Sequence, residues 1–259
     1  MPEIFLDLLI NSKNYRLQKA IYLLWAKYEI FHPFLFKILN KIGYLDERVD
    51  KIIRDYSNKK KDFFFIQIGA NDGVFINLIY LYVKKYGWKG IFIEPVEYIF
   101  QKLKLNYHNT RGLIFENIAI SNKDGFEDFY RLKEIKGNVV QIWDMIGSLS
   151  KKHTTKHKKD IKELDKYLIK EKVECLTLNS LLKKYGVKKI DFLQIDAESY
   201  DYYILKQIPF NEIKPSMIMY EYINMTKRQE KYIASYLTKK GYSIIKLHID
   251  CFAYLNENL

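Results

Sequence analysis

The pattern of apolar positions changes near residue 60. Over residues 1–58, apolar side chains such as Ile21, Leu24 and Tyr28 recur at helical spacing, which predicts two or three helices in an N-terminal helical extension. From residue 62 onward, short apolar runs alternate with amphipathic stretches. Short strands spaced by amphipathic helices predict an α/β fold, in which a parallel sheet is covered by helices on both faces.

This alternation predicts one domain over residues 59–259. The expected strands lie at 63–69, 89–94, 112–121, 173–178, 189–199 and 215–223, with a hairpin or added strand at 124–132 and a closing hairpin at 241–255. Helices are expected at 74–87, 95–107, 179–186 and 200–208, with a last helix ending at residue 240. Residues 131–172 break the rhythm and contain the basic run KKHTTKHKKD, so we interpret them as a basic lid insertion.

Composition and charge narrow the picture only slightly. Lys and Arg number 43 against 31 Asp and Glu, and the resulting charge of +12 favours anionic partners or reflects a Lys-rich composition unrelated to binding. The two cysteines, Cys175 and Cys251, are too few for a disulfide scaffold or a metal cluster, which fits a reducing cytoplasm. The most apolar stretch, residues 20–39, is interrupted by charges and Pro33, so we expect no membrane span and a cytoplasmic protein.

Polar residues and glycines follow the first predicted strand. Gly69, Asn71, Asp72 and Gly73 form a turn at its carboxyl end, where open parallel sheets bind ligands, although a tight strand-to-helix turn needs the same residue types. Glu94 ends the second strand, where an acid binds ribose hydroxyls. The turn lacks the middle glycine of a pyrophosphate fingerprint, and Asp72 matches a cation such as the ammonium and sulfonium of S-adenosylmethionine.

Four segments resemble one known family. IGANDG, FIEPVEYIFQKLK, ENIAISNKDG and TLNSLLKKYGVKKIDFLQIDAESYDYYILK are similar to motifs of the FkbM family of S-adenosylmethionine-dependent methyltransferases, and the resemblance extends over residues 60–255. In this chain Gln194 replaces the family's usual lysine and Ser199 its usual glycine. The resemblance implies a Rossmann-like class I methyltransferase fold with a mostly parallel seven-stranded sheet.

The resemblance also implies roles for individual residues. Gly69, Asn71, Asp72 and Gly73 would surround the methionine part of the cofactor, and Glu94 would hold its ribose. The adenine would be flanked by three residues after the third strand, Asn117, Ile118 and Ala119, with Ser121 nearby. Asp196 would face the transferred methyl group, and Ser148 of the segment GSLS would contact cofactor or acceptor.

Alcohol acceptors need a group that removes a proton. Asp196 can orient or deprotonate a hydroxyl, alone or through a divalent cation shared with Glu198, and because no third ligand is apparent we do not expect a metal. Both acids could instead cap the helix near residue 200. Glu221 ends another strand and can bind acceptor hydroxyls or be solvated, whereas His153 is either a general base or an exposed side chain. Lys152 and its neighbours can attract a diphosphate or solvate a helix.

These observations predict an O-methyltransferase that acts on a sugar hydroxyl, because known members of the family methylate hydroxyls of sugars and polyketides. The expected acceptor is a nucleotide-linked sugar or a glycan used in surface polysaccharide synthesis. One alternative is an RNA-directed methyltransferase or nucleic-acid-binding module, which the charge and the 22 tyrosines favour. A second is a nicotinamide oxidoreductase, which the missing fingerprint disfavours. A third is a cofactor-binding pseudoenzyme. The N-terminal helices are expected to pack on the core, form a homodimer face or cap a substrate cleft.

Overall fold

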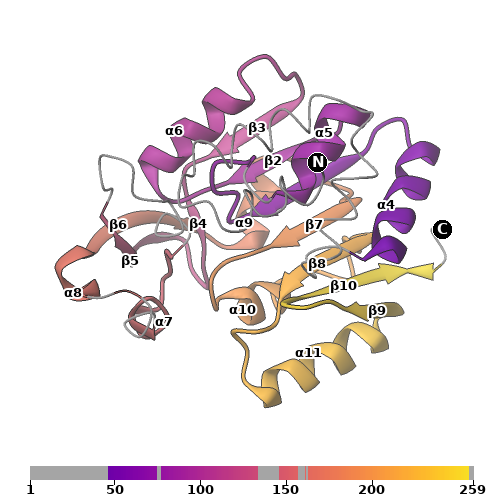
Figure 1. Cartoon of the computed structure of the whole chain (residues 1–259). Helices are drawn as coiled ribbons and strands as arrows, with labels where there is room; N and C mark the ends of the chain where they lie inside the picture. Colours follow the sequence, from indigo (N-terminus) through magenta and orange to yellow (C-terminus); the bar gives the residue numbers. More distant parts are fainter. Residues whose placement is uncertain (1–45, 75–76, 134–145, 157–160, 162, 257–259) are drawn as a thin grey trace, which may run out of the picture.

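The computed structural model describes residues 46–74, 77–133, 146–156, 161 and 163–256 (Figure 1). Within them, a seven-stranded sheet has the order β3-β2-β1-β7-β8-β10-β9. Its strands are β1 (Phe64–Ile68), β2 (Lys89–Ile93), β3 (Leu113–Glu116), β7 (Phe192–Ile195), β8 (Met217–Glu221), β9 (Tyr242–Lys246) and β10 (Asp250–Leu255). β10 is antiparallel to both of its neighbours, and the other pairs are parallel. The expected Rossmann-like, mostly parallel sheet is therefore confirmed.

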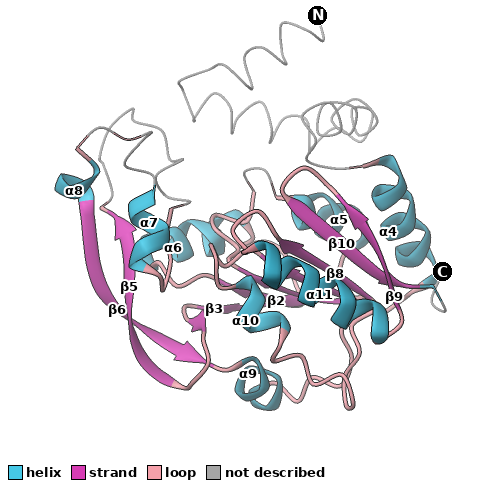
Figure 2. Cartoon of the chain, turned by 90° about the horizontal axis from the view of Figure 1, so that it is seen from below, coloured by secondary structure: helices cyan, strands magenta, loops and turns pink. Residues whose placement is uncertain are grey.

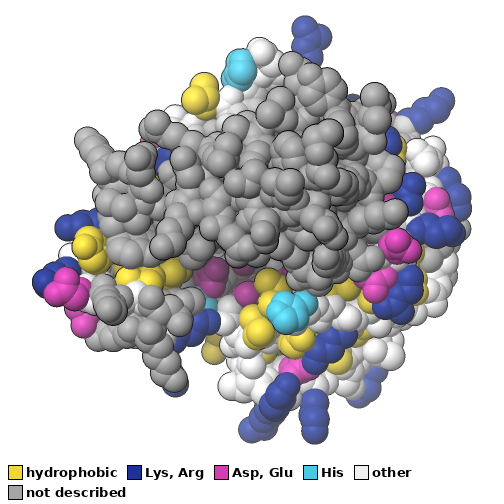
Figure 3. Space-filling view, in the orientation of Figure 1, with side chains coloured by type: hydrophobic (Ala, Val, Ile, Leu, Met, Phe, Trp, Pro, Cys, Tyr) yellow, Lys and Arg dark blue, Asp and Glu magenta, His cyan; other side chains and the backbone are white. Residues whose placement is uncertain are grey.

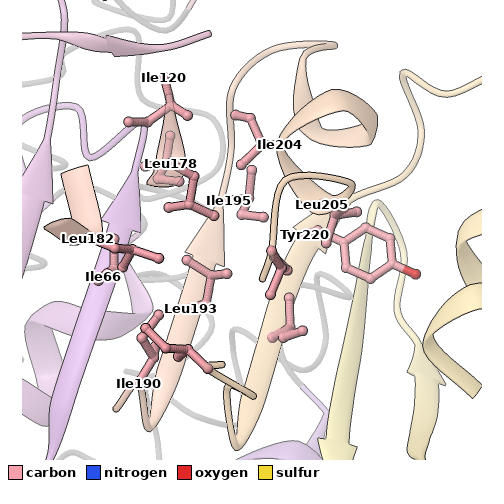
Figure 4. Packing of buried hydrophobic residues seen from close by; sticks show 14 of the residues in the cluster. Ile66, Ile120, Leu178, Leu182, Ile190, Leu193, Ile195, Ile204, Leu205 and Tyr220 are labelled. Atoms are coloured by element: carbon pink, nitrogen blue, oxygen red, sulfur yellow. The ribbon is translucent and has the colours of Figure 1, made fainter. Parts of the chain in front are cut away.

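Helices cover both faces of this sheet because its strands are apolar on both sides. One core contains side chains from α4 (Glu47–Lys59), α5 (Leu78–Tyr86) and α6 (Glu97–Asn106), and the other contains side chains from α9 (Leu178–Lys184), α10 (Asp201–Leu205) and α11 (Lys227–Lys239). Alternate residues of one strand enter different cores: Phe192 enters the first, and Leu193 and Ile195 enter the second (Figure 4). Burial on both faces explains why the strands are continuous apolar runs in the sequence.

A second, three-stranded sheet corrects the expected strand pattern. It has the order β4-β6-β5, with β4 (Ala119–Ile120), β5 (Gly125–Leu132) and β6 (Leu168–Leu176). The single strand expected at 112–121 is thus two strands in different sheets, because the chain leaves the main sheet after Glu116. The expected lid, residues 131–172, also contributes structure here: α7 (Lys151–Lys156), α8 (Leu164–Tyr167) and the first half of β6. Figure 2 shows α7 beside β5.

The described end of the N-terminal extension packs on the main sheet. Helix α4 begins at Asp46, which caps it by accepting from Arg48 N at 2.8 Å, and it buries Val49 and Ile53. Its Tyr56 hydroxyl donates to Asp191 at 2.7 Å, next to β7. The helices expected over residues 1–45, with their possible dimer face or cleft cap, lie outside the described residues. In the described parts of the chain, no helix has the length and apolar character needed to cross a membrane.

Candidate functional site

A cavity lies at the carboxyl ends of β1, β2 and β7, where the strand order reverses. Such a reversal separates the loops of neighbouring strands and leaves a crevice between them. The cavity encloses about 670 Å³ of empty space, part of which is open to solvent. Its walls are the β1 turn, the end of β2, the second sheet, the segment around Leu149 and the turn after β7. The sequence-predicted residues that line it are Gly69, Asn71, Glu94, Ile118, Ala119, Asp196 and Glu198.

Gly69 lets the β1 turn approach the end of β7. Its φ is +78°, and a Cβ atom at this position would lie 1.8 Å from the backbone oxygen of Asp196. The Gly69 and Ala70 N–H groups both donate to Ile93 O, at 3.0 and 2.9 Å, so the turn is also tied to β2. Only a glycine fits between these two strands in this conformation.

Asp72 and Gly73 are in the same turn but do not line the cavity. Asp72 is 1% exposed and its Oδ1 accepts from Val74 N at 2.9 Å. Gly73 has a φ of +71°, and a Cβ there would lie 2.6 Å from the ring of Tyr107, whose hydroxyl donates to Gly73 O at 2.6 Å. The structure therefore gives both residues a role in shaping the turn.

Glu94 links the ends of β1 and β2 at the wall of the cavity. Its Oε2 accepts from Asn71 N at 2.9 Å and its Oε1 accepts from Val96 N at 3.0 Å. These bonds fix the orientation of the carboxylate at the cavity wall. Asn117 supports the same region from outside the lining, because its side chain donates to the backbone oxygens of Glu94 and Pro95 at 2.9 and 3.1 Å.

Several lining residues were not identified from the sequence. Val96, Phe129 and Leu149 form an apolar wall, and Tyr200 lies at the far side with its hydroxyl accepting from Asn122 at 3.1 Å. Phe129 and Leu149 reach the cavity only because the second sheet folds over it, and no local pattern predicts that arrangement.

Five carboxylates gather around the ends of β7 and β8: Asp196, Glu198, Asp201, Glu221 and Asp250. Asp196 is partly exposed to the cavity but otherwise surrounded by protein, and burial together with repulsion from Glu198 and Glu221 holds its pKa well above the usual range. Burial and neighbouring acids also raise the pKa of Glu221 to about 8, and burial raises the pKa of Asp250 to about 7. Asp201 is buried, and its pKa is raised by burial and by Glu221.

The turn after β7 has an unusual backbone. Glu198 and Ser199 have φ values of +46° and +81°, a conformation that costs a non-glycine residue about 1–2 kcal/mol. Ser148 Oγ donates to Glu198 O at 2.7 Å, and His153 Nε2 lies 2.6 Å from Glu198 Oε2. Helix α10 is capped by Tyr200 without a side-chain bond, so neither Asp196 nor Glu198 is its cap.

The residues predicted in the basic segment have different positions. His153 is 5% exposed, which excludes the interpretation as an exposed side chain, but its ring contacts Glu198 and is not part of the cavity wall. Lys152 is exposed and also lies outside the wall. Glu221 is close enough to Asp196 to raise the pKa of Asp196 by repulsion, and Glu198 raises the pKa of Glu221 in the same way, but Glu221 does not line this cavity. Among the described residues, no group of three or more His, Cys, Asp or Glu could hold a metal ion.

The cavity fits a nucleoside with a cationic tail. Its described lining contains three carboxylates and no Lys, Arg or His, so it offers no side-chain charge to a pyrophosphate. Glu94 suits a ribose diol, the apolar wall suits an adenine ring, and Asp196 and Glu198 suit a sulfonium or ammonium group. S-adenosylmethionine has these three parts in one molecule, whereas a nicotinamide dinucleotide requires a phosphate site.

Comparison with known proteins gives the same class. The family model described as the methyltransferase FkbM domain matches residues 67–244, which is more than half of the chain. No curated protein sequence matches. The methyltransferase FkbM from Methylobacillus flagellatus KT is similar in structure, with a TM-score of 0.50 and 12% identity, over 97% of this chain and 58% of that chain. This chain therefore spans less than two thirds of that protein's length.

Two further solved structures are more distant. A methyltransferase from Pyrococcus furiosus has a TM-score of 0.36 and 11% identity, over 80% of this chain and 81% of that chain. Fibrillarin from Aeropyrum pernix, solved with natively bound S-adenosyl-L-methionine, has a TM-score of 0.37 and 10% identity, over 75% of this chain and 66% of that chain. At such identities, structural similarity concerns the fold alone.

Proposed function

Because the chain belongs to the family of FkbM methyltransferases, we propose that it is an S-adenosylmethionine-dependent O-methyltransferase that acts on a sugar hydroxyl. The observation that carries this proposal is Asp196, a carboxylate of raised pKa at the wall of a cavity that suits the cofactor. The acceptor is a nucleotide-linked sugar or a glycan used in surface polysaccharide synthesis, and the reaction takes place in the cytoplasm.

The cofactor would be held by residues from three strand ends. Gly69 and Asn71 would contact its methionine part, Glu94 would accept from the ribose hydroxyls, and Ile118 and Ala119 would flank the adenine. When bound, S-adenosylmethionine supplies a methyl group already activated by the positive sulfur. The protein therefore has two tasks, which are to align the acceptor oxygen with that methyl group and to remove its proton.

Asp196 would act as the proton acceptor. A carboxylate of ordinary pKa is a weak base toward an alcohol, and burial beside other acids makes Asp196 a stronger one. The acceptor hydroxyl loses its proton when the methyl group leaves the sulfur, which converts S-adenosylmethionine to S-adenosylhomocysteine, and Asp196 would take that proton. Glu198 and Glu221 would accept hydrogen bonds from other hydroxyls of the same sugar, and Lys152, exposed on α7, would attract the phosphates of a nucleotide-linked sugar.

An RNA acceptor is the alternative that the net charge of +12 favours. Figure 3 shows Lys and Arg side chains spread around the edge of the described surface in this view. Acids near the end of β7 would repel phosphates that lie close to the reacting hydroxyl. A neutral glycan avoids that repulsion, and a nucleotide-linked sugar avoids it if its phosphates lie toward Lys152.

A methyl-transfer screen tests the proposal. The purified protein is incubated with S-adenosylmethionine labelled in its methyl group and with nucleotide sugars, including GDP-linked heptoses and hexoses, neutral oligosaccharides, or total RNA. Label in a sugar supports the proposal, and label only in RNA supports the alternative. Binding of NAD without binding of S-adenosylhomocysteine, measured by thermal shift, would overturn the cofactor assignment.

With an acceptor identified, Asp196→Asn tests the proton transfer. We expect kcat to fall by about 100-fold or more, while the Kd for S-adenosylhomocysteine stays within about threefold, because the base acts in the transition state. Asp250→Asn is the matched control, since it removes a neighbouring carboxylate that does not line the cavity, and we expect it to lower kcat by less than about tenfold. Equal losses in the two variants would remove Asp196 from the role of base.

A further inference from the structure

Residues 146–156, which include α7, connect the cofactor cavity to the second sheet. Ser148 is 1% exposed and pairs with Tyr130 of β5 through two backbone hydrogen bonds of 2.8 and 2.9 Å. Its neighbours Gly147 and Leu149 line the cavity. Thr154 of α7 is fully buried and donates to Tyr130 O at 3.1 Å. The segment is therefore docked on β5 through Ser148 and Thr154.

The same segment contacts Glu198 at both its backbone and its side chain. Ser148 Oγ donates to Glu198 O at 2.7 Å, and Ser148 Oγ itself accepts from Ser150 N at 3.0 Å. His153 Nε2 lies 2.6 Å from Glu198 Oε2, and the His153 side chain is only 3% exposed. These contacts act on Glu198, one of two consecutive non-glycine residues that have a left-handed φ.

A second connection runs from the end of α7 to Glu221. Lys156 Nζ donates to Asn224 Oδ1, and Asn224 Nδ2 donates to Glu221 Oε2. The positive charge of Lys156 also opposes the rise in the pKa of Glu221. One short segment thus reaches two carboxylates that belong to different strand ends, β7 and β8, and that repel each other.

We infer that residues 146–156 form a clasp whose Ser148 and His153 hold Glu198, and whose Lys156 holds Glu221 through Asn224, in the orientation that the acceptor requires. Ser148 and His153 are positioning residues in this arrangement, since neither lines the cavity. The inference rests on the proposed function only in taking Glu198 and Glu221 as the acceptor-facing groups. Gly147 and Leu149 of the clasp also wall the cofactor cavity. The orientation of Glu198 and the affinity for the cofactor are therefore coupled.

Two effects destabilise the turn after β7 and explain why it needs contacts from another segment. The left-handed backbone at Glu198 and Ser199 favours relaxation of the turn, and repulsion among Asp196, Glu198 and Glu221 pushes the carboxylates apart. Tertiary contacts must therefore stabilise a backbone conformation that the local sequence disfavours. A bond to the Glu198 backbone and a contact to its carboxylate restrain both the position and the direction of the side chain.

Hydrogen exchange on the free protein tests the clasp without any ligand. In His153→Ala and Ser148→Ala we expect the amides of residues 197–200 to exchange about tenfold faster or more, because the turn opens locally. Thr154→Val is the matched control, since it removes a hydrogen bond between α7 and β5 but no contact to Glu198, and exchange at 197–200 should stay within about threefold of wild type. His153→Gln, whose side-chain amide can donate a hydrogen bond to Glu198, should restore slow exchange. The clasp is refuted if His153→Ala and Thr154→Val have the same effect on the turn.

Calorimetry with S-adenosylhomocysteine tests the coupling. We expect His153→Ala to weaken its binding by about three- to tenfold in a chain that keeps Glu198, and to have no further effect in the Glu198→Gln background. Thr154→Val should weaken binding equally in both backgrounds or not at all. Additive effects of His153→Ala and Glu198→Gln would overturn the coupling. If the wild type does not bind S-adenosylhomocysteine, the proposed function fails, and the exchange experiment still decides whether the clasp exists.

Discussion

Gly69→Ala tests whether the β1 turn and the end of β7 hold each other in place. The new Cβ would lie 1.8 Å from the backbone oxygen of Asp196 and 2.8 Å from its carbonyl carbon, and real Cβ contacts below 3.0 Å essentially do not occur. The two segments must therefore separate by about 1.2 Å. Movement of the turn strains its bonds to Ile93 O, and movement of β7 strains the bond of 2.9 Å from Asp196 N to Ile68 O.

The expected loss of stability has two parts. Holding an alanine at a φ of +78° costs about 1–2 kcal/mol, and weakening one or two strand-end hydrogen bonds costs about 0.5–1.5 kcal/mol each. We therefore expect the free energy of unfolding to fall by about 3 kcal/mol. Gly87→Ala isolates the first part, because Gly87 has a φ of +65° and a Cβ there meets nothing within 4 Å. Its loss should be about 1 kcal/mol.

Urea unfolding and calorimetry with S-adenosylhomocysteine measure the two consequences. Gly69→Ala should also weaken ligand binding by at least about tenfold, since Gly69 and Asp196 both line the cavity, whereas Gly87→Ala should leave binding unchanged. The reasoning is refuted if the two variants lose the same stability and both retain full affinity. That outcome would mean that the turn moves away from β7 without penalty and does not fix the position of Asp196.

Two further predictions concern the acids and the turn after β7. Burial and, after it, repulsion from Glu198 raise the pKa of Glu221 from 4.5 to about 8. Between these pH values the folded protein therefore binds more protons than the unfolded chain. Its free energy of unfolding should fall by more than about 1 kcal/mol from pH 5 to pH 9. In Glu221→Gln this decrease should be smaller in thermal or urea unfolding, and an unchanged profile would contradict the raised pKa. Ser199→Gly should raise the free energy of unfolding by about 0.5–1 kcal/mol, because glycine accepts the φ of +81° without strain, and a loss of stability in the same assay would contradict this.

The main sheet and the cofactor side of the cavity could be predicted because local patterns determine them. Continuous apolar runs at 63–69 and 189–199 identify buried strands, and residues that follow such strands meet at one edge of a parallel sheet. Gly69, Glu94 and Asp196 all lie at that edge as expected. For Asp72 the sequence predicts the turn but not the direction of the carboxylate, which can face a ligand or the backbone. Its Oδ1 accepts from Val74 N, and a contact with the cofactor stays a prediction.

The second sheet could not be predicted from local patterns. Residues 112–121 read as one strand because nothing in the apolar run indicates where the chain leaves the main sheet. The sharp change of direction depends on Asn117, which donates to backbone oxygens of the loop after β2, 22 and 23 residues away in the chain. Likewise, His153 is in a segment rich in lysine and looks solvated, and it is buried only because Thr154 and Ser148 dock its helix on β5. Both features depend on long-range contacts.

The charge of the whole chain and the charge of its site have opposite signs. Net charge is a sum over the surface, and most of the 43 basic residues contribute to it from positions that do not contact a ligand. The cavity is lined by Glu94, Asp196 and Glu198, and among its described lining residues none is basic. A ligand in the cavity experiences these nearby carboxylates more strongly than distant lysines, because Coulomb energy falls with distance and solvent salt screens the surface charges first. A basic protein can therefore bind a cationic cofactor, and its isoelectric point is a poor guide to its ligands.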